Sequence, residues 1–217
     1  MANTHVYTKK EEVANAITHG IGVVLSIAAL VFLIIFSVQQ GNAWHVAAAT
    51  IYGVSMLTLF VASTLVHSFP EGKAKDVFEI FDHSAIYFFI AGTYTPIMLI
   101  AVHGTLGWTL LSIVWVVAIV GTVFKAFFVK KFLFLSTLLY IAMGWMIVIA
   151  WGPISANLPA TGVQLLMIGG LLYTVGAIFY VWRGFPFHHA VWHLFVLGGS
   201  ATHFFAVLLY IIPIQLL

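Results

Sequence analysis

Five polar side chains in this 217-residue sequence have the types and spacing of a metal-dependent active site. His189 and His193 are four residues apart, so a helix would present both imidazoles on one face. His67, with Ser63 four residues before it, and Asp82 lie in two other apolar segments. Three imidazoles match one class of catalytic zinc site, in which water takes the fourth position.

The residue types suggest a division of labour. Three neutral imidazoles leave the full charge of a zinc ion unbalanced, which lowers the pKa of a water ligand to about 7. Asp82 could balance that charge and accept a proton, while Ser63 could orient a ligand or a substrate oxygen. Residues 189–193 read His-Ala-Val-Trp-His, so the glutamate of the zinc metalloprotease helix is absent. In the alternative interpretation, the histidines bind no metal and form hydrogen bonds between helices.

The other histidines are weaker candidates. His19 lies in the inner half of the first apolar segment and can hydrogen-bond toward the site. His83 is expected to be structural, and His188 is expected to be a loop residue. His203 follows His189 by fourteen residues, roughly 21 Å along a helix, which is too far to ligate the same ion. Three more are expected to be solvated: His5, His45 and His103.

Composition places these residues in a membrane. Hydrophobic residues make up 63% of the chain and charged residues only 6%, whereas soluble domains carry about 25% charged residues. The net charge of +2 is too small to indicate a nucleic-acid partner. The absence of cysteine excludes disulfides, thiolate metal sites and a cysteine nucleophile.

Continuous apolar runs separated by short Gly- and Pro-containing connections predict an all-α integral membrane protein. We expect residues 1–12 to form a cytoplasmic tail and residues 13–217 to form one seven-helix transmembrane domain. The expected spans are Val13–Val38, Trp44–Val66, Phe78–Val102, Leu106–Phe124, Phe132–Trp151, Gly162–Trp182 and Ala190–Ile212.

Basic residues predict the orientation of the bundle. All eight Lys and Arg residues fall on alternate connections, and the other side of the expected membrane has none. The positive-inside rule then places the N-terminus in the cytoplasm and the C-terminus outside. The candidate metal site would face the cytoplasmic leaflet of a multi-pass cell membrane protein. The basic residues are Lys9, Lys10, Lys73, Lys75, Lys125, Lys130, Lys131 and Arg183.

Several motifs resemble those of a known family. Over nearly its whole length the sequence is similar to the bacterial hemolysin III proteins, which belong with the progestin and adiponectin-receptor superfamily. The segments that carry the resemblance are Asn15–Gly20, Ser63–His67, Phe81–Ser84, Ala91–Pro96 and His189–His193.

The resemblance implies a zinc site that faces the cytoplasmic leaflet. It implies His67, His189 and His193 as the ligands, with Asp82 near the zinc-bound water and Ser63 beside them. Eukaryotic relatives carry a long polar N-terminal region where this chain has about a dozen residues, so a hormone-receptor role is not implied. The superfamily includes alkaline ceramidases, which points to hydrolysis of lipid amides.

Three classes of function follow from these residues. The first is a zinc-dependent hydrolase that acts on an amide or ester of a membrane lipid at the cytoplasmic leaflet. The second is a sensor or regulator of lipid state, in which the zinc is structural. The third is a cytolytic pore, for which the sequence offers no amphipathic secreted segment. Membrane lipid is the expected substrate or ligand in the first two classes, and the sequence does not indicate an oligomeric state.

The orientation makes a direct prediction. A reporter enzyme that is active only outside the cytoplasm should be active when it is fused after Leu217 and inactive when it is inserted beside Lys73. The reason is that the basic connections are retained on the cytoplasmic side. Reporter activity in colonies measures both fusions, and the reverse pattern would invert the bundle and the placement of the site.

Overall fold

A computed structural model describes residues 7–216, and within them every regular element is a helix. Seven helical rods are long and apolar enough to cross a membrane, which confirms the expected seven-helix bundle. Two of the rods end in a π-helical turn, and one is interrupted by a 3₁₀ turn. In chain order the elements are α1 Lys9–Gln40, α2 Ala43–Ser68, α3 Lys73–Pro96 with π-helix Ile97–Val102, α4 Gly104–Phe128, α5 Leu133–Trp145 with 3₁₀-helix Met146–Ala150 and α6 Trp151–Asn157, α7 Ala160–Val181, and α8 His188–Ala206 with π-helix Val207–Ile211.

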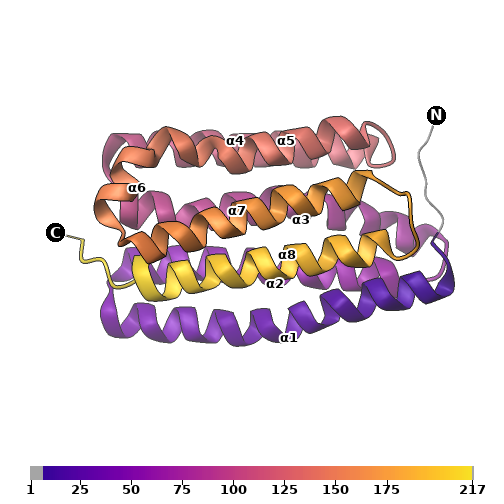
Figure 1. Cartoon of the computed structure of the whole chain (residues 1–217), viewed down its shortest axis with the longest axis horizontal. Coiled ribbons are helices and arrows are strands. Elements are labelled where there is room, and N and C mark those ends of the chain that lie inside the picture. The colour runs from indigo at the N-terminus through magenta and orange to yellow at the C-terminus, as the bar shows by residue number, and fades with distance from the viewer. Residues whose placement is uncertain (1–6, 217) are drawn as a thin grey trace.

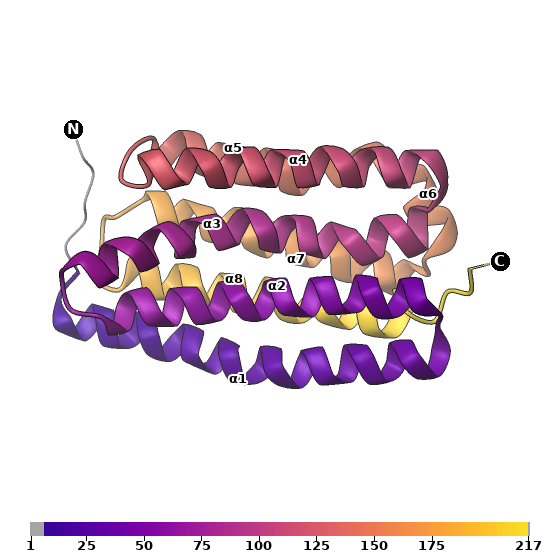
Figure 2. The same cartoon turned by 180° about the vertical axis from the view of Figure 1, so that it is seen from behind.

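The rods run up and down along one long axis. Figure 1 shows α1 on one side of the bundle and α4 and α5 on the opposite side, with α7 and α8 in front. Figure 2 shows α2 and α3 on the other face. Successive rods alternate in direction, so the starts of α1, α3, α5 and α8 share one end of the bundle with the last turn of α2. This common end brings together residues that are far apart in the sequence.

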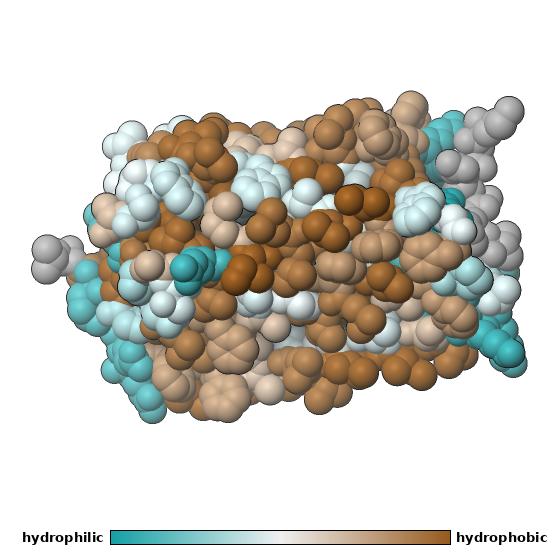
Figure 3. Space-filling view, in the orientation of Figure 1, coloured by the Kyte–Doolittle hydropathy of each residue, from teal (hydrophilic) through white to brown (hydrophobic). Residues whose placement is uncertain are grey.

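The outer surface is apolar and the polar side chains point inward. Figure 3 shows a hydrophobic band around the bundle with hydrophilic residues at its two ends. On α1, Val24 is 68% exposed, whereas Asn15, His19 and Ser26 are buried against the other helices. A soluble helix has the opposite pattern, but in hydrocarbon a polar group needs a partner inside the protein.

Small residues let some of the helices approach closely. A Cβ at Gly22 would clash with the ring of Phe60, and equivalent clashes occur at Gly169 and Gly199. At these three positions the missing side chain allows close packing between membrane helices. Glycine has no such role at three other helical positions, because a Cβ there would make only ordinary contacts: Gly20, Gly170 and Gly198.

Several expected boundaries differ from the structure, and two of the differences have a clear local cause. The first helix begins at Lys9 rather than Val13, because Thr8 and Glu11 form a capping box that satisfies its free amide groups. The connection expected from Gly152 to Pro159 is helical as far as Asn157. Pro153 is tolerated there because it lies in the first turn of α6, where no intrahelical acceptor is needed.

Gly22 offers a test of the packing. Replacing Gly22 by Ala should destabilise the bundle by about 1–3 kcal/mol, because the methyl group forces Phe60 and α2 outward. Gly20→Ala on the same helix is the matched control and should be neutral, since the nearest atom, on Thr64, is 3.9 Å from the new Cβ. Thermal unfolding in detergent measures both, and equal midpoints would contradict the close α1–α2 contact.

Candidate metal centre

Three histidines converge at the common end of the bundle. His67 lies in the last turn of α2, and His189 and His193 lie in the first two turns of α8. Each offers one ring nitrogen, and these three atoms all lie within 4.8 Å of one another. Antiparallel packing of the helices produces this meeting, because the end of α2 and the start of α8 are at the same depth.

A carboxylate on α1 holds the His67 ring. Its Nδ1 lies 2.6 Å from Oε2 of Glu12, and its Nε2 is buried without a hydrogen-bond partner among the described residues. The other oxygen of Glu12 forms an ion pair with Lys75 at the start of α3. A carboxylate that accepts the Nδ1 proton selects the tautomer in which Nε2 carries a free lone pair.

The α8 histidines are held from the same side. His193 Nδ1 lies 3.0 Å from the Thr18 hydroxyl and 3.2 Å from the Asn15 carbonyl oxygen, so its proton points to α1. Its ring stacks on His19, with ring centroids 3.5 Å apart. In His189, Nδ1 is buried and has no hydrogen-bond partner within residues 7–216. The nitrogens that α1 does not engage are therefore the ones available to a ligand.

The donor set fits a divalent metal ion. Imidazole nitrogens on one tetrahedral zinc ion, at about 2.0–2.1 Å from it, are about 3.4 Å apart, so the three ring nitrogens, which here lie within 4.8 Å of one another, need shifts of only about 1 Å. Unpaired imidazole nitrogens inside a bundle are costly, and a cation bound to their lone pairs removes that cost. The second nitrogens of His67 and His193 already have the oxygen partners that orient histidine ligands in metal sites.

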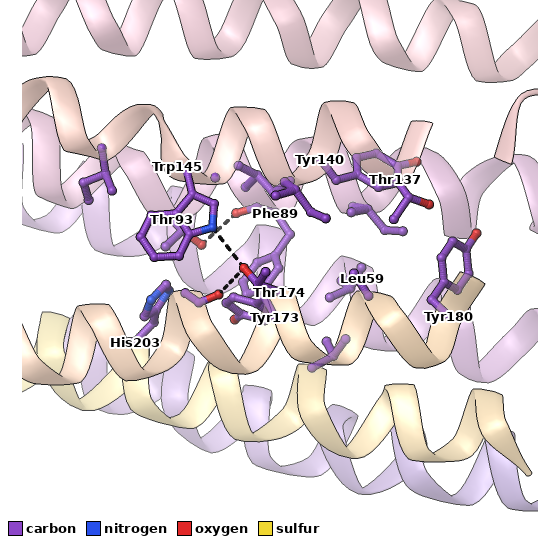
Figure 4. Close-up of a pocket in the computed structure, with 18 of the residues that line it drawn as sticks. Leu59, Phe89, Thr93, Thr137, Tyr140, Trp145, Tyr173, Thr174, Tyr180 and His203 are labelled. Atoms are coloured by element: carbon purple, nitrogen blue, oxygen red, sulfur yellow. Dashed lines mark hydrogen bonds between the residues drawn. The ribbon is translucent and has the colours of Figure 1, made fainter. Parts of the chain in front are cut away.

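A cavity of about 150 Å³ extends from the three-histidine cluster into the bundle. His189 and His193 line one end of it together with Ser63 and Asp82, and His203 lines the other end. Figure 4 shows its long course from Tyr180 and Tyr140 to Trp145 and His203. The volume exceeds by far the roughly 10–15 Å³ that one water molecule needs, and most of the lining is apolar.

Ser63 and Asp82 lie in the wall of this cavity, as neighbours of the cluster. Ser63 is 1% exposed, one turn before His67 on α2. Asp82 lies on α3, and its oxygens are outside the group of three ligand atoms. This placement brings both predicted site residues to the same space as His189 and His193. It leaves the roles assigned to them as predictions.

The segment before α1 covers the cluster. The ring of Tyr7 lies 5.1 Å from that of His189 and 5.9 Å from that of His67. Burial raises the pKa of Tyr7, which keeps its phenol neutral. Glu11 ties the same segment to the α7–α8 connection, since its Oε1 accepts a hydrogen bond of 3.0 Å from the Phe187 amide. The cluster is therefore closed toward the end of the bundle.

The structure revises the expectations for the remaining histidines. His83 is structural, as expected, because its ring nitrogens lie within 3.0 Å of the Glu79 carbonyl and the Tyr180 hydroxyl. His188 is a buried residue of α8 rather than a loop residue, since α8 begins there and packs on α7. His203 lines the far end of the cavity, away from the cluster, as its spacing predicted.

His45 and His103, at the other end of the bundle from the cluster, differ in their exposure to solvent. His45 was expected to be solvated and is buried, because its ring joins Asn42 to the Ile214 carbonyl and so caps α2. His103 is exposed, as expected. His5 lies outside the described residues.

Sequence reasoning missed Glu12, Asn15 and Thr18 as supports on α1, and it expected a hydrogen bond from His19, which instead stacks on His193. These four residues recur at three- and four-residue intervals, which places them along one helix face. That period was the signal, but nothing local showed which helix the face would meet. Lys75 depends on the same packing: its spacing in the sequence suits a pair with Glu79, four residues later, but in the structure Lys75 pairs with Glu12 and Glu71.

Comparison with known proteins agrees with these motifs. The family model described as "Haemolysin-III related" matches residues 7–204. The "Hemolysin-3 homolog" of Bacillus subtilis (strain 168) is 59% identical over 98% of this chain and 100% of its own length. "Hemolysin-3" of Bacillus cereus is 58% identical over 94% of this chain and 93% of its own length. The human "Monocyte to macrophage differentiation factor" is 31% identical over 93% of this chain and 84% of its own length.

Proposed function

The chain belongs to the haemolysin-III-related family, and from this premise we propose that it is a zinc-dependent hydrolase of a membrane lipid amide or ester. The observation that carries the proposal is the meeting of His67, His189 and His193 at the end of a largely apolar cavity. Polar catalytic groups next to an apolar chamber suit a substrate with a polar head and a hydrocarbon chain.

The ligand set would be the three histidines. When bound, zinc polarises a substrate carbonyl and acidifies a water molecule. The protein contributes the orientation of the rings, through Glu12 for His67 and through Thr18 and Asn15 for His193. Because these contacts come from α1, the position of that helix controls the metal affinity.

Asp82 and Ser63 would act on the substrate side of the site. Both line the cavity beside the histidines, so a scissile carbonyl can reach them. Asp82 would accept the proton of the attacking water and then pass it to the leaving nitrogen or oxygen. The Ser63 hydroxyl would donate a hydrogen bond to the substrate oxygen as negative charge develops there.

A second function, a lipid-state sensor with structural zinc, is favoured by one observation. Tyr7 and Glu11 cover the histidine cluster from the end of the bundle, so water and product would have to pass through the interior or past this cover. A structural metal needs no such route. A cytolytic function is supported only by the names of the two Bacillus relatives, which call them hemolysins.

Metal content tests the ligand set. The purified protein should hold about one zinc per chain, and His193→Ala should lose it because one of the three histidine ligands is removed. Glu12→Gln should keep the fold and weaken zinc binding by roughly 10–100-fold, since the amide no longer fixes the His67 tautomer. Elemental analysis after dialysis against a graded chelator measures this, with the exposed His103→Ala as control. Full zinc in a His67/His189/His193 triple alanine variant would refute the site.

Asp82 separates the two functions. Asp82→Asn keeps the shape but cannot take a proton, so an enzyme should keep zinc and lose most turnover, at least about 100-fold. A sensor with structural zinc should be unaffected. Hydrolysis of a labelled ceramide and a labelled phospholipid is measured beside zinc content and thermal stability, in parallel with His193→Ala.

Glu79→Gln is the matched control, because Glu79 lies one turn earlier on α3 and pairs with Lys130. That variant should keep both zinc and turnover. Loss of zinc in Asp82→Asn as complete as in His193→Ala would make Asp82 a ligand and remove the open position for water.

A further inference from the structure

Lys125 is fully buried near the end of α4, on the opposite side of the bundle from α1. It lies one turn before the helix ends at Phe128, where lysine side chains normally extend to the water interface. Here the side chain is 0% exposed, and Nζ has no hydrogen-bond partner among the described residues.

Helix α3 brings two hydroxyl groups to the depth of Lys125. The ring of Tyr87 packs directly on Gly121 of α4, where no Cβ would fit. Lys125 is one turn after Gly121, and Ser84 is one turn before Tyr87. Because α3 and α4 run in opposite directions, these two steps lead to the same depth.

Helix α5 adds a further hydroxyl group at this depth. Tyr87 and Tyr140 make an edge contact with ring centroids 4.5 Å apart, and Ser136 is one turn before Tyr140. Since α3 and α5 run in the same direction, Ser136 lies at the depth of Ser84 and Lys125. The lysine cluster is therefore Ser84, Tyr87, Lys125 and Ser136, contributed by three helices.

All four members of the lysine cluster are at least 95% buried, and none of their polar side-chain atoms has a hydrogen-bond partner within the described chain. Thr122, one turn before Lys125, has a buried hydroxyl in the same state. Three hydroxyls and one ammonium left unpaired at one depth of the bundle, with the Thr122 hydroxyl as a fourth, would cost several kcal/mol. All of these groups can donate hydrogen bonds, which is the chemistry of an anion site.

No protein carboxylate fills this role. Glu79 is the acidic residue whose charge acts on Lys125, but its side chain lies about one turn nearer the start of α3 than Ser84 and pairs with Lys130 at 3.7 Å. Lys130 also pairs with Asp76, at 2.6 Å. The buried positive charge thus has no carboxylate within ion-pair distance in the described residues.

We propose that the lysine cluster binds the phosphate oxyanion of a membrane phospholipid headgroup. Lys125 is about 4.5 Å from the end of its 25-residue helix, so in a helix centred in the bilayer it lies close to the boundary between the hydrocarbon core and the headgroups. Around it, Phe127 and Phe134 are 76% and 70% exposed and can contact acyl chains. Basic pockets between membrane helices bind anionic lipid headgroups in this way.

This site is separate from the histidine cluster. Lys125, Ser84 and Ser136 do not line the central cavity, and the proposal stands whether or not the chain hydrolyses a lipid. Tyr140 contacts Tyr87 on one side and lines the central cavity on the other, so it lies between the lysine cluster and that cavity.

The test uses purified full-length protein in detergent and short-chain lipids as probes. Dihexanoyl phosphatidylglycerol should raise the thermal midpoint by about 2–4 °C, and dihexanoyl phosphatidylcholine should raise it less. Lys125→Met should abolish the difference between the two lipids. Lys131→Met removes an equal charge from the same end of the bundle and should leave the difference unchanged.

A second variant protects the test against misfolding of Lys125→Met. Ser84→Ala/Ser136→Ala keeps the ammonium and should weaken binding of phosphatidylglycerol about tenfold. Inorganic phosphate is added in parallel. Stabilisation by phosphate that depends on Lys125, without any by the lipid, would show an oxyanion site for a free ion and overturn the lipid assignment. A response to phosphatidylglycerol that survives both Lys125→Met and the serine variant would overturn the site itself.

Discussion

Hydrocarbon around the seven helices offers no hydrogen bonds, and this constraint decides where most of the described polar side chains lie. A lone imidazole or hydroxyl facing lipid would be costly, so most of them point between helices or toward the ends of the bundle, and the exposed Thr58 hydroxyl donates to the Val54 carbonyl of its own helix. The inward stripe on α1 and the apolar outer surface of the same helix are two results of one requirement. Polar residues therefore concentrate in a few places, and these places are the candidates for function.

The three-histidine cluster shows how such a place acquires chemistry. Burial alone would leave its imidazoles free to rotate and to change tautomer. Glu12 and the Thr18 hydroxyl fix two of the rings from α1, and Lys75 holds Glu12 in turn. Each partner lies on a different helix from the residue that it holds, so the site is built by the packing of the bundle rather than by any one segment. The same packing closes the end of the site with Tyr7 and opens its inner side to the cavity.

The lysine cluster and the histidine cluster require ligands of opposite charge. Imidazole nitrogens with free lone pairs require a cation, whereas an ammonium surrounded by hydroxyls requires an anion. The two clusters lie at the same end of the bundle, the first between α1, α2 and α8 and the second between α3, α4 and α5. The chain therefore presents one end rich in polar groups, while the opposite half of the bundle is held mainly by apolar packing and hydrogen bonds such as that from Asn157 to the Ala101 carbonyl.

The sequence by itself determined the seven spans and the three histidines, because apolar length and four-residue spacing are local properties. It also indicated that Ser63 and Asp82 belong at the depth of the histidines. Only the tertiary structure decided which partners these residues meet: Glu12 rather than Glu79 for Lys75, α1 for the back of His193, and burial for His45, His188 and Lys125. Such contacts join residues up to 178 positions apart, and they depend on how helices rotate and pack against one another. Hydrophobic periodicity shows that a helix has an inner face, but the neighbour of that face is set by the shape of the whole bundle.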